Sequence, residues 1–260
     1  MKAKWAALLA GGVMAIPLIA TANAGAATVT LGSPLTSNFI ALEAQGVGTS
    51  AMIAGPGIVS PVDGTVISWR GQEFSGGPFR LRVLKLAPLN RASGDGTGPP
   101  LMANGGRTEQ AVNLPIHQGE VVGFDNGAPT DEVGAVGAGT PYTVEGWSPP
   151  LADGGSPRGS FVQSGPEYAY NATVRYCLVP NVIGMKLGAA RQALASADCT
   201  LGSVTQKKFK KKKGKKKPKG PKIVKSQSAP GGTSLGDQAP VNVHVKVKPK
   251  KKKHQKHKKK

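Results

Sequence analysis

Residues 177–248 constrain the fold most, because their pattern changes sharply from one kind of secondary structure to another. Residues 179–184 form an apolar run interrupted by Pro180, which predicts a short edge strand. A helix is predicted over residues 185–198, where Leu187, Ala190, Leu194 and Ala197 recur at intervals of three and four.

Three further strands are predicted at residues 201–204, 223–228 and 241–247. The last of them alternates strictly between apolar and polar residues, as a half-buried strand does. One helix covering one face of a small antiparallel sheet, a small α+β unit, accounts for this order.

These segments carry five short motifs in a fixed order. They are Val-Pro-Asn-Val-Ile-Gly at 179–184, Leu-x-x-Ala-x-x-x-Leu at 187–194, Leu-Gly-x-Val at 201–204, Ser-Gln-Ser-x-Pro-Gly at 226–231 and Val-Asn-Val-x-Val at 241–245. In this order they resemble the PASTA domain, a module associated with penicillin-binding proteins and serine/threonine kinases. The resemblance covers residues 177–248 and implies recognition of peptidoglycan fragments. Two departures are a Lys-rich insertion at 207–222 and a displaced glycine, Gly236, ahead of the last strand.

The positive charge of the chain is concentrated in this same part. The net charge is +20, yet residues 177–260 hold 24 Lys and Arg against two Asp, while the remaining residues hold 10 basic and 12 acidic side chains. A dense lysine array favours adhesion to an anionic polymer. The lysines assigned to that role are Lys207, Lys208, Lys210, Lys211, Lys212, Lys213, Lys215, Lys216, Lys217, Lys219, Lys222, Lys250, Lys251, Lys252 and Lys253. The alternative is that both lysine runs are solvated segments that aid solubility. The tail at 249–260 repels itself and is expected to be disordered.

The first 26 residues have the pattern of a secretory signal peptide. Lys2 and Lys4 precede an apolar run at 5–20, and Ala-Asn-Ala at 22–24 offers a small-x-small cleavage site. A membrane anchor is the alternative, but the run is short for a span. The pattern predicts export from a bacterial cell and association with the envelope.

The two cysteines fit an exported protein. Cys177 opens the first strand of the PASTA-like unit, and Cys199 directly follows its helix, so the two ends can lie side by side. We expect a disulfide bond. Two free thiols or a metal site are the alternatives, although two ligands without a nearby histidine are too few for zinc.

Residues 27–176 are predicted to form an all-β domain. Alternating segments at 65–70 and 79–86, and strand-like segments at 111–116, 120–124 and 168–176, are separated by turns rich in Gly and Pro. This pattern favours a β-sandwich, jelly-roll-like in topology. We recognise no family in this part.

Two stretches within that domain, 90–107 and 127–159, are predicted to be long loops because of their Gly and Pro content. Tyr142 and Trp147 lie in the second and could contact a glycan through exposed rings, or they could instead seal the end of the sandwich. Five carboxylates could bind calcium but lack any recognised spacing, and solvated loop acids are the alternative. They are Asp63, Asp125, Asp131, Glu132 and Asp153.

The sequence contains no phosphate-binding glycine loop, nucleophile elbow or penicillin-binding catalytic motif. We therefore predict no enzyme activity, no catalytic residues, no metal and no cofactor. The expected function is that of an exported cell-envelope protein that binds peptidoglycan or anionic cell-wall polymers, or an anionic lipid surface. The alternatives are a secreted polycation that binds nucleic acid and a purely structural spacer.

Overall fold

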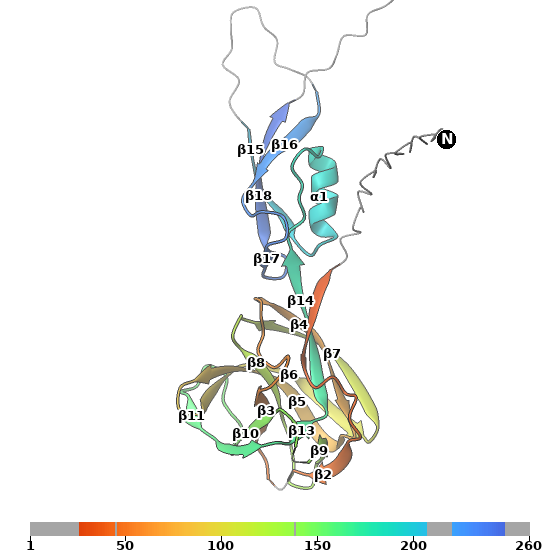
Figure 1. Cartoon of the computed structure of the whole chain (residues 1–260), viewed down its shortest axis with the longest axis vertical. Helices are drawn as coiled ribbons and strands as arrows, with labels where there is room; N and C mark the ends of the chain where they lie inside the picture. The colour runs from red at the N-terminus through yellow and green to blue at the C-terminus, as the bar shows by residue number, and fades with distance from the viewer. Residues whose placement is uncertain (1–25, 45, 138, 207–219, 248–260) are drawn as a thin grey trace, which may run out of the picture.

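The computed structural model describes residues 26–44, 46–137, 139–206 and 220–247 (Figure 1). Strands dominate the part before Cys177, as predicted. They are β1 (Ala27–Gly32), β2 (Ile40–Glu43), β3 (Thr49–Ala54), β4 (Gly64–Gln72), β5 (Ser75–Ala87), β6 (Arg91–Asn104), β7 (Arg107–Ile116), β8 (Val121–Asp125), β9 (Glu132–Val136), β10 (Thr143–Trp147), β11 (Arg158–Gly159), β12 (Phe161–Ser164), β13 (Glu167–Tyr168) and β14 (Tyr170–Leu178).

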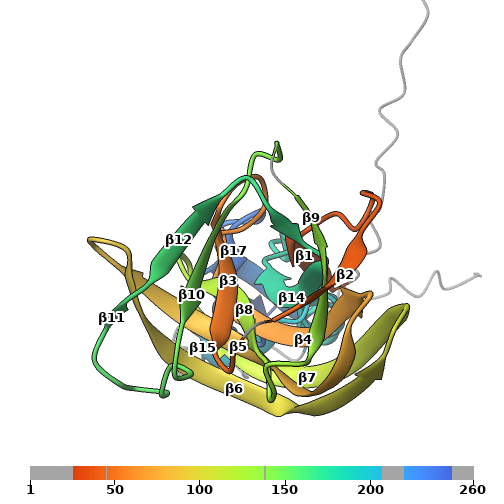
Figure 2. The same ribbon diagram turned by 90° about the horizontal axis from the view of Figure 1, so that it is seen from below.

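These strands form two sheets that share one hydrophobic core. One sheet has the order β1-β14-β4-β7, and the other has the order β11-β6-β5-β8-β3-β10-β12, with β9 joining β5, β2 and β13. Figure 2 shows that the second sheet curls strongly around the core. The prediction of a mostly β fold is confirmed, whereas a jelly-roll topology is not.

Aromatic rings fill the centre of this core. Phe74 packs edge-on against Trp69, Phe79 and Phe124, with ring centroids 5.0 to 6.0 Å apart. Tyr170 joins them and is fully buried. Its hydroxyl accepts a hydrogen bond from the N–H of Met52 and donates one to the carbonyl of Val122, so the ring is buried without losing its polar contacts.

The prediction that residues 90–107 form a loop is wrong, because β6 occupies most of them and pairs along β5 with several register shifts. The second predicted loop, 127–159, likewise contains β9 and β10. β6 tolerates Pro99 and Pro100 because, in the described part of the chain, the pairings on its other edge involve Arg91, Ala92 and Gly94 and do not reach the prolines. The Gly and Pro content therefore predicted loops at positions where the chain forms the long strand β6 and the short strands β9 and β10.

The C-terminal part contains one helix, α1 (Leu187–Ala195), together with β15 (Thr200–Gln206), β16 (Lys222–Gln227), β17 (Ser234–Leu235) and β18 (Pro240–Val247). Its sheet has the order β15-β18-β16. The helix prediction is confirmed, with Ala190 and Leu194 buried on its inner face. The prediction of an antiparallel sheet is wrong in one pairing: β15 and β18 are parallel. The chain reverses direction between β15 and β16 and again between β16 and β18, so β18 has the same direction as β15. Because β18 lies between the other two strands, it pairs in parallel with β15 and antiparallel with β16.

The predicted edge strand at residues 179–184 is not a strand. β14 ends at Leu178, and the chain continues without a ladder through Pro180, which has no N–H to donate. Val179 and Val182 are nevertheless buried in the core of this part. The N–H of Val179 donates to the carbonyl of Thr233 and its carbonyl accepts from the N–H of Gly232, so the run has the expected packing but no regular ladder.

β14 links the two hydrophobic cores. It pairs with β1 and β4 through residues Tyr170 to Tyr176, and then with β17 through Cys177 and Leu178 (Figure 1). The predicted domain boundary at Tyr176 therefore falls inside a continuous strand. Separate folding of residues 27–176 and 177–248 remains a prediction.

The predicted signal peptide (1–26) lies almost wholly outside the described residues, as does most of the insertion 207–222 and all of the tail 249–260. Among the residues that are described, no helix combines the length and the apolar character needed to cross a membrane.

Candidate functional site

Cys177 and Cys199 are joined by a disulfide bond, with their Cα atoms 4.9 Å apart. The prediction is confirmed. The bond connects the end of β14 to the residue before β15, so it ties the helix-containing segment back onto the strand that enters it. The bond closes a loop with a sequence separation of 22 residues. In the chain-entropy treatment such a loop stabilises the fold by about 3 kcal/mol.

The two acidic residues of the C-terminal part both face Arg175 of β14. The guanidinium Nη2 lies 2.8 Å from Asp237 Oδ2, and Nε lies 4.0 Å from Asp198 Oδ1. The hydrogen bond with Asp237 and the nearby carboxylates raise the pKa of Arg175, which remains charged. Both acids thus lie beside Arg175 at the junction between the two cores, and Asp237 is the one hydrogen-bonded to it.

The remaining charged side chains described in residues 177–247 are all basic and exposed. They are Lys186, Arg191, Lys222, Lys225 and Lys246. Lys222, at the start of β16, is the one member of the predicted lysine set that lies among the described residues; Lys207–Lys219 and Lys250–Lys253 lie outside them. The described outer surface of this part is therefore positively charged and carries no acid away from the junction.

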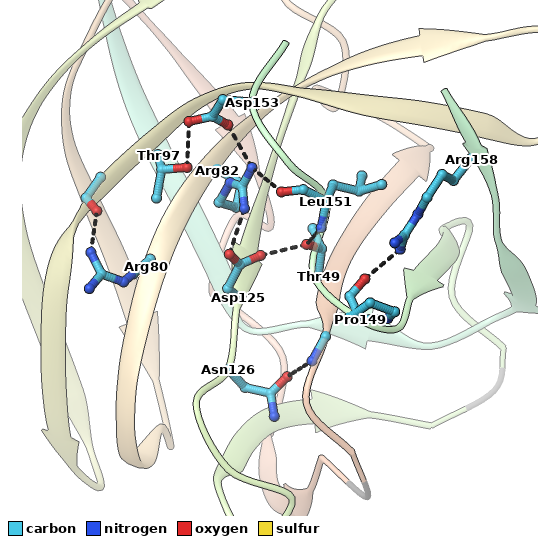
Figure 3. Close-up of polar contacts among 12 residues, drawn as sticks. Thr49, Arg80, Arg82, Thr97, Asp125, Asn126, Pro149, Leu151, Asp153 and Arg158 are labelled. Atoms are coloured by element: carbon cyan, nitrogen blue, oxygen red, sulfur yellow. Dashed lines mark hydrogen bonds and ion pairs between the residues drawn. The ribbon is translucent and has the colours of Figure 1, made fainter. Parts of the chain in front are cut away.

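A second polar cluster lies in the β-strand part and is centred on Arg82 (Figure 3). Arg82 is only 3% exposed. Its Nη1 donates to Asp125 at 2.6 Å, and its Nη2 donates to Asp153 and to the carbonyl of Leu151, each at 2.6 Å. Thr49 donates to the other Asp125 oxygen at 2.5 Å.

Burial raises the pKa of the Asp125 carboxyl, while the hydrogen bond from Thr49 and the charge of Arg82 lower it. Both terminal nitrogens of Arg82 have protein partners. Leu151 and Asp153 belong to the segment between β10 and β11, so the cluster fastens that segment to β5 and β8 (Figure 3). A methyl group at Gly94 would collide with both Arg82 and Asp153, which shows how tightly the segment sits. We assign this cluster a structural role.

Comparison with known proteins identifies one part of the chain. The sequence model of the PASTA domain matches residues 178–246. The resemblance inferred from the motifs is therefore confirmed. The match covers the region of α1, β15, β16, β17 and β18, including the disulfide-closed segment that contains α1. No curated protein sequence and no solved structure matches the chain.

Tyr142 and Trp147, the residues predicted for a glycan contact, are buried in the core outside the PASTA domain, at 6% and 1% exposure. Trp147 Nε1 donates to the carbonyl of Arg158. Burial raises the pKa of Tyr142. Neither ring offers an exposed stacking face, which agrees with the alternative that both seal the interior.

The five carboxylates considered for calcium do not converge. Asp125 and Asp153 bind Arg82, and Asp131 accepts hydrogen bonds from the N–H groups of Gly77, Gly127 and Ala128. In the described part of the chain, no group of three or more His, Cys, Asp or Glu side chains could hold a metal ion.

Neither Arg82, which forms a buried ion pair, nor Arg175, which forms a partly buried one, was identified from the sequence. Arg175 could have been suspected, because it lies two residues before Cys177 and is the one charged residue of its strand. Arg82 occupies a position that alternation assigns to the solvent side of its strand, so the sequence contains no signal for its burial.

Proposed function

We propose that this protein is an exported, non-catalytic binding protein of the bacterial cell envelope, whose PASTA domain contacts peptidoglycan or an associated wall polymer. The observation that carries the proposal is the PASTA match over residues 178–246, because the PASTA domain is a binding module and not a catalytic unit. The disulfide within that domain supports an oxidising compartment, where such bonds persist.

The charge distribution supports a second contribution to binding. The acids of the PASTA domain are held at Arg175, and its described exposed charges are basic. The lysine segments 207–222 and 250–253 belong to the same part of the sequence, so their charge adds to that of the PASTA surface. Exposed charges are screened beyond about 8–10 Å at physiological salt, so adhesion of this kind requires a densely charged partner such as a wall phosphate polymer.

Adhesion through lysines and recognition by a folded domain differ in their salt dependence. Lysines that neutralise phosphates release counterions, and binding falls steeply as salt rises. Hydrogen bonds and apolar contacts on a folded surface depend less on salt. The two contributions can therefore be separated in one experiment.

The experiment measures retention of the full chain on isolated cell envelope at low and at high salt. One variant replaces the fifteen assigned lysines by Gln, and a matched variant replaces the same lysines by Arg, which keeps the charge. We expect the Gln variant to lose most of the low-salt retention and the Arg variant to keep it, with a salt-resistant remainder common to all three proteins. Equal low-salt retention of the Gln variant would contradict the lysine contribution.

Nucleic acid is the competing partner for a polycation, and a parallel measurement on duplex DNA distinguishes it. We expect wall material to retain the protein at salt concentrations that release it from DNA. If DNA retains all three proteins as well as or better than the envelope does, the protein is a general polyanion binder and the assignment to the envelope is wrong.

A further inference from the structure

A pocket of about 520 Å³ opens in the β-strand part, between β2 and β9 on one side and β3, β10 and β12 on the other. Its volume lies in the range of small-molecule sites. Figure 1 places β2, β9 and β13 at the end of the β-strand part that is remote from α1 and β18, and Figure 2 looks toward that end. The pocket is therefore distant from the PASTA domain.

Large apolar side chains gather at this pocket. Leu42, Val47 and Phe161 line it and yet remain 43%, 38% and 57% exposed. A single exposed apolar residue needs no explanation, but exposed residues that converge on one concave site indicate a binding surface.

Phe124, Tyr168 and Ser50 form the floor of the pocket, which therefore holds two of the four hydroxyl-bearing residues that line it. Phe124 and Tyr168 meet edge to face with centroids 5.6 Å apart, and both line the pocket. Burial raises the pKa of Tyr168, and a hydrogen bond with Ser50 lowers it. Ser50 also lines the pocket, so the floor offers a hydroxyl pair within apolar walls.

Residues 46–48 form the rim of the pocket and are held in place by polar contacts. The side-chain amide of Asn126 donates to the carbonyls of Gly46 and Ala128, at 2.5 and 2.8 Å, and accepts from the N–H of Gly48 at 3.1 Å. Ser148 donates to the carbonyl of Val47 at 3.0 Å. A rim fixed in this way costs little further ordering when a ligand binds.

Phe161 is positioned by the strand beside it. It lies opposite Gly146 in the pairing of β12 with β10, and a methyl group at Gly146 would collide with the Phe161 ring. The ring therefore lies over the bare backbone of Gly146, at the wall of the pocket.

The charge of the pocket limits its ligand. Among the described residues that line it, Glu43 is the one side chain charged at neutral pH, and none is Lys, Arg or His. An anionic ligand would therefore meet a like charge without a compensating cation. The amide of Asn126 is already committed to the rim.

We propose that this pocket binds the apolar chain of a small amphiphile whose polar head group is uncharged. The apolar side chains of Leu42, Val47 and Phe161 and the aromatic floor contact the chain, and the carboxylate of Glu43 accepts a hydrogen bond from the head group. The proposal concerns a different part of the molecule from the PASTA domain, and it holds or fails independently of wall binding.

The test titrates the full chain with octyl glucoside, octyl sulfate and methyl glucoside, each below the concentration at which micelles form. The readout is the NMR resonances of Leu42, Val47 and Phe161, because octyl sulfate also adheres to the lysine segments. We expect saturable shifts with octyl glucoside, weaker binding of octyl sulfate at these resonances, and no binding of methyl glucoside. Equal binding of methyl glucoside would make the pocket a glycan site, and the absence of shifts with octyl glucoside would overturn the proposal.

Two variants at exposed positions sharpen the result. Phe161→Ala should weaken octyl glucoside binding on the order of tenfold through lost apolar contact. Met102→Ala, which removes an exposed apolar side chain of β6 away from the pocket, should leave it unchanged. Glu43→Lys should reverse the head-group preference and tighten octyl sulfate binding at the pocket roughly fivefold. If Phe161→Ala and Met102→Ala act alike, or if Glu43→Lys leaves the preference as it was, the proposal is wrong.

Discussion

Arg175 and Asp237 form a two-point contact across the junction between the two cores, with Nη2–Oδ2 at 2.8 Å and Nε–Oδ1 at 3.2 Å. Arg175 lies on β14, and Asp237 lies just before β18. The Asp237 side chain is 8% exposed and the Arg175 side chain 30%. The contact therefore couples the PASTA domain to the β-strand part in a partly dry environment.

Replacing Arg175 by Ala should lower the free energy of unfolding by about 1–3 kcal/mol, because Asp237 and Asp198 would lose the cation that they face. Denaturant unfolding measures the change. Arg70→Ala is the control, since its partner Glu109 is 50% exposed, against 8% for Asp237, and exposed pairs contribute roughly 0–1 kcal/mol. Equal losses of unfolding free energy in the two variants would show that the junction contact stabilises the protein no more than an exposed ion pair does.

Reducing the disulfide, or replacing both cysteines by Ser, should lower the stability of the PASTA domain by about 3 kcal/mol. Hydrogen exchange at single residues is the measurement. We expect protection to fall in α1, β15, β16 and β18 and to persist in β4, β5 and β8. If protection falls equally in all of these elements, the two cores unfold as one unit and the prediction of two folding units is wrong. Peptide mapping of unreduced protein should recover Cys177 and Cys199 in one linked peptide pair.

Replacing Arg82 by Leu should be among the most damaging single changes in the β-strand part. It leaves the buried Asp125 without its cation, and breaking a buried pair costs about 3–5 kcal/mol. Asp153→Asn should cost less, because the Asp153 side chain is 43% exposed and its amide can still accept from Arg82. Thermal melting of both variants gives the comparison, and an equal or larger loss for Asp153→Asn would contradict the structural role assigned to Arg82.

Glu145 gives a prediction for pH. It is 1% exposed, and burial raises its pKa above the ordinary value of 4.5, opposed by a hydrogen bond with Ser160. A carboxyl with a raised pKa in the folded protein contributes stability that is fully present below its unfolded pKa and is lost as pH rises through the folded value. Glu145→Gln should therefore be more stable than the parent protein at neutral pH, and the advantage should vanish below the unfolded pKa.

Thermal melting across that pH range checks the sign. Glu109→Gln serves as a control of opposite direction, because its hydrogen bond with Arg70 lowers the pKa of Glu109. An advantage of Glu145→Gln that grows as pH falls would contradict the assigned cause.

The PASTA domain could be predicted from the sequence because each of its elements carries a local signal. The spacing of Leu187, Ala190 and Leu194 predicts the buried face of α1, and alternation predicts β18. Strand direction was not predictable in the same way, since the parallel pairing of β15 with β18 depends on which strand takes the central place. The edge strand expected at 179–184 is absent because Pro180 has no N–H to donate, and isolated hydrogen bonds such as that from Val179 to Thr233 take the place of a ladder.

The sequence was sufficient to predict that the β-strand part is all-β, but not all of the segments that form strands or how they pair. β6 contains glycines and prolines that favour a loop locally, and it becomes a strand through pairing with β5. The alternating pattern of β5 places Arg82 on the solvent side of the strand. Its burial depends on a segment some 70 residues later in the chain. The pocket between β2 and β12 likewise arises from strands distant in sequence, which no single motif predicts.

We propose that the PASTA domain itself recognises peptidoglycan, in addition to any adhesion by lysines. Co-sedimentation tests this with the full-length Lys-to-Gln variant and purified peptidoglycan that has been stripped of anionic polymers, at high salt. We expect saturable retention that soluble peptidoglycan fragments compete away and that an unrelated insoluble polysaccharide does not reproduce. Loss of all retention, with the Cys177–Cys199 disulfide shown to be intact in the same sample, would contradict the proposal.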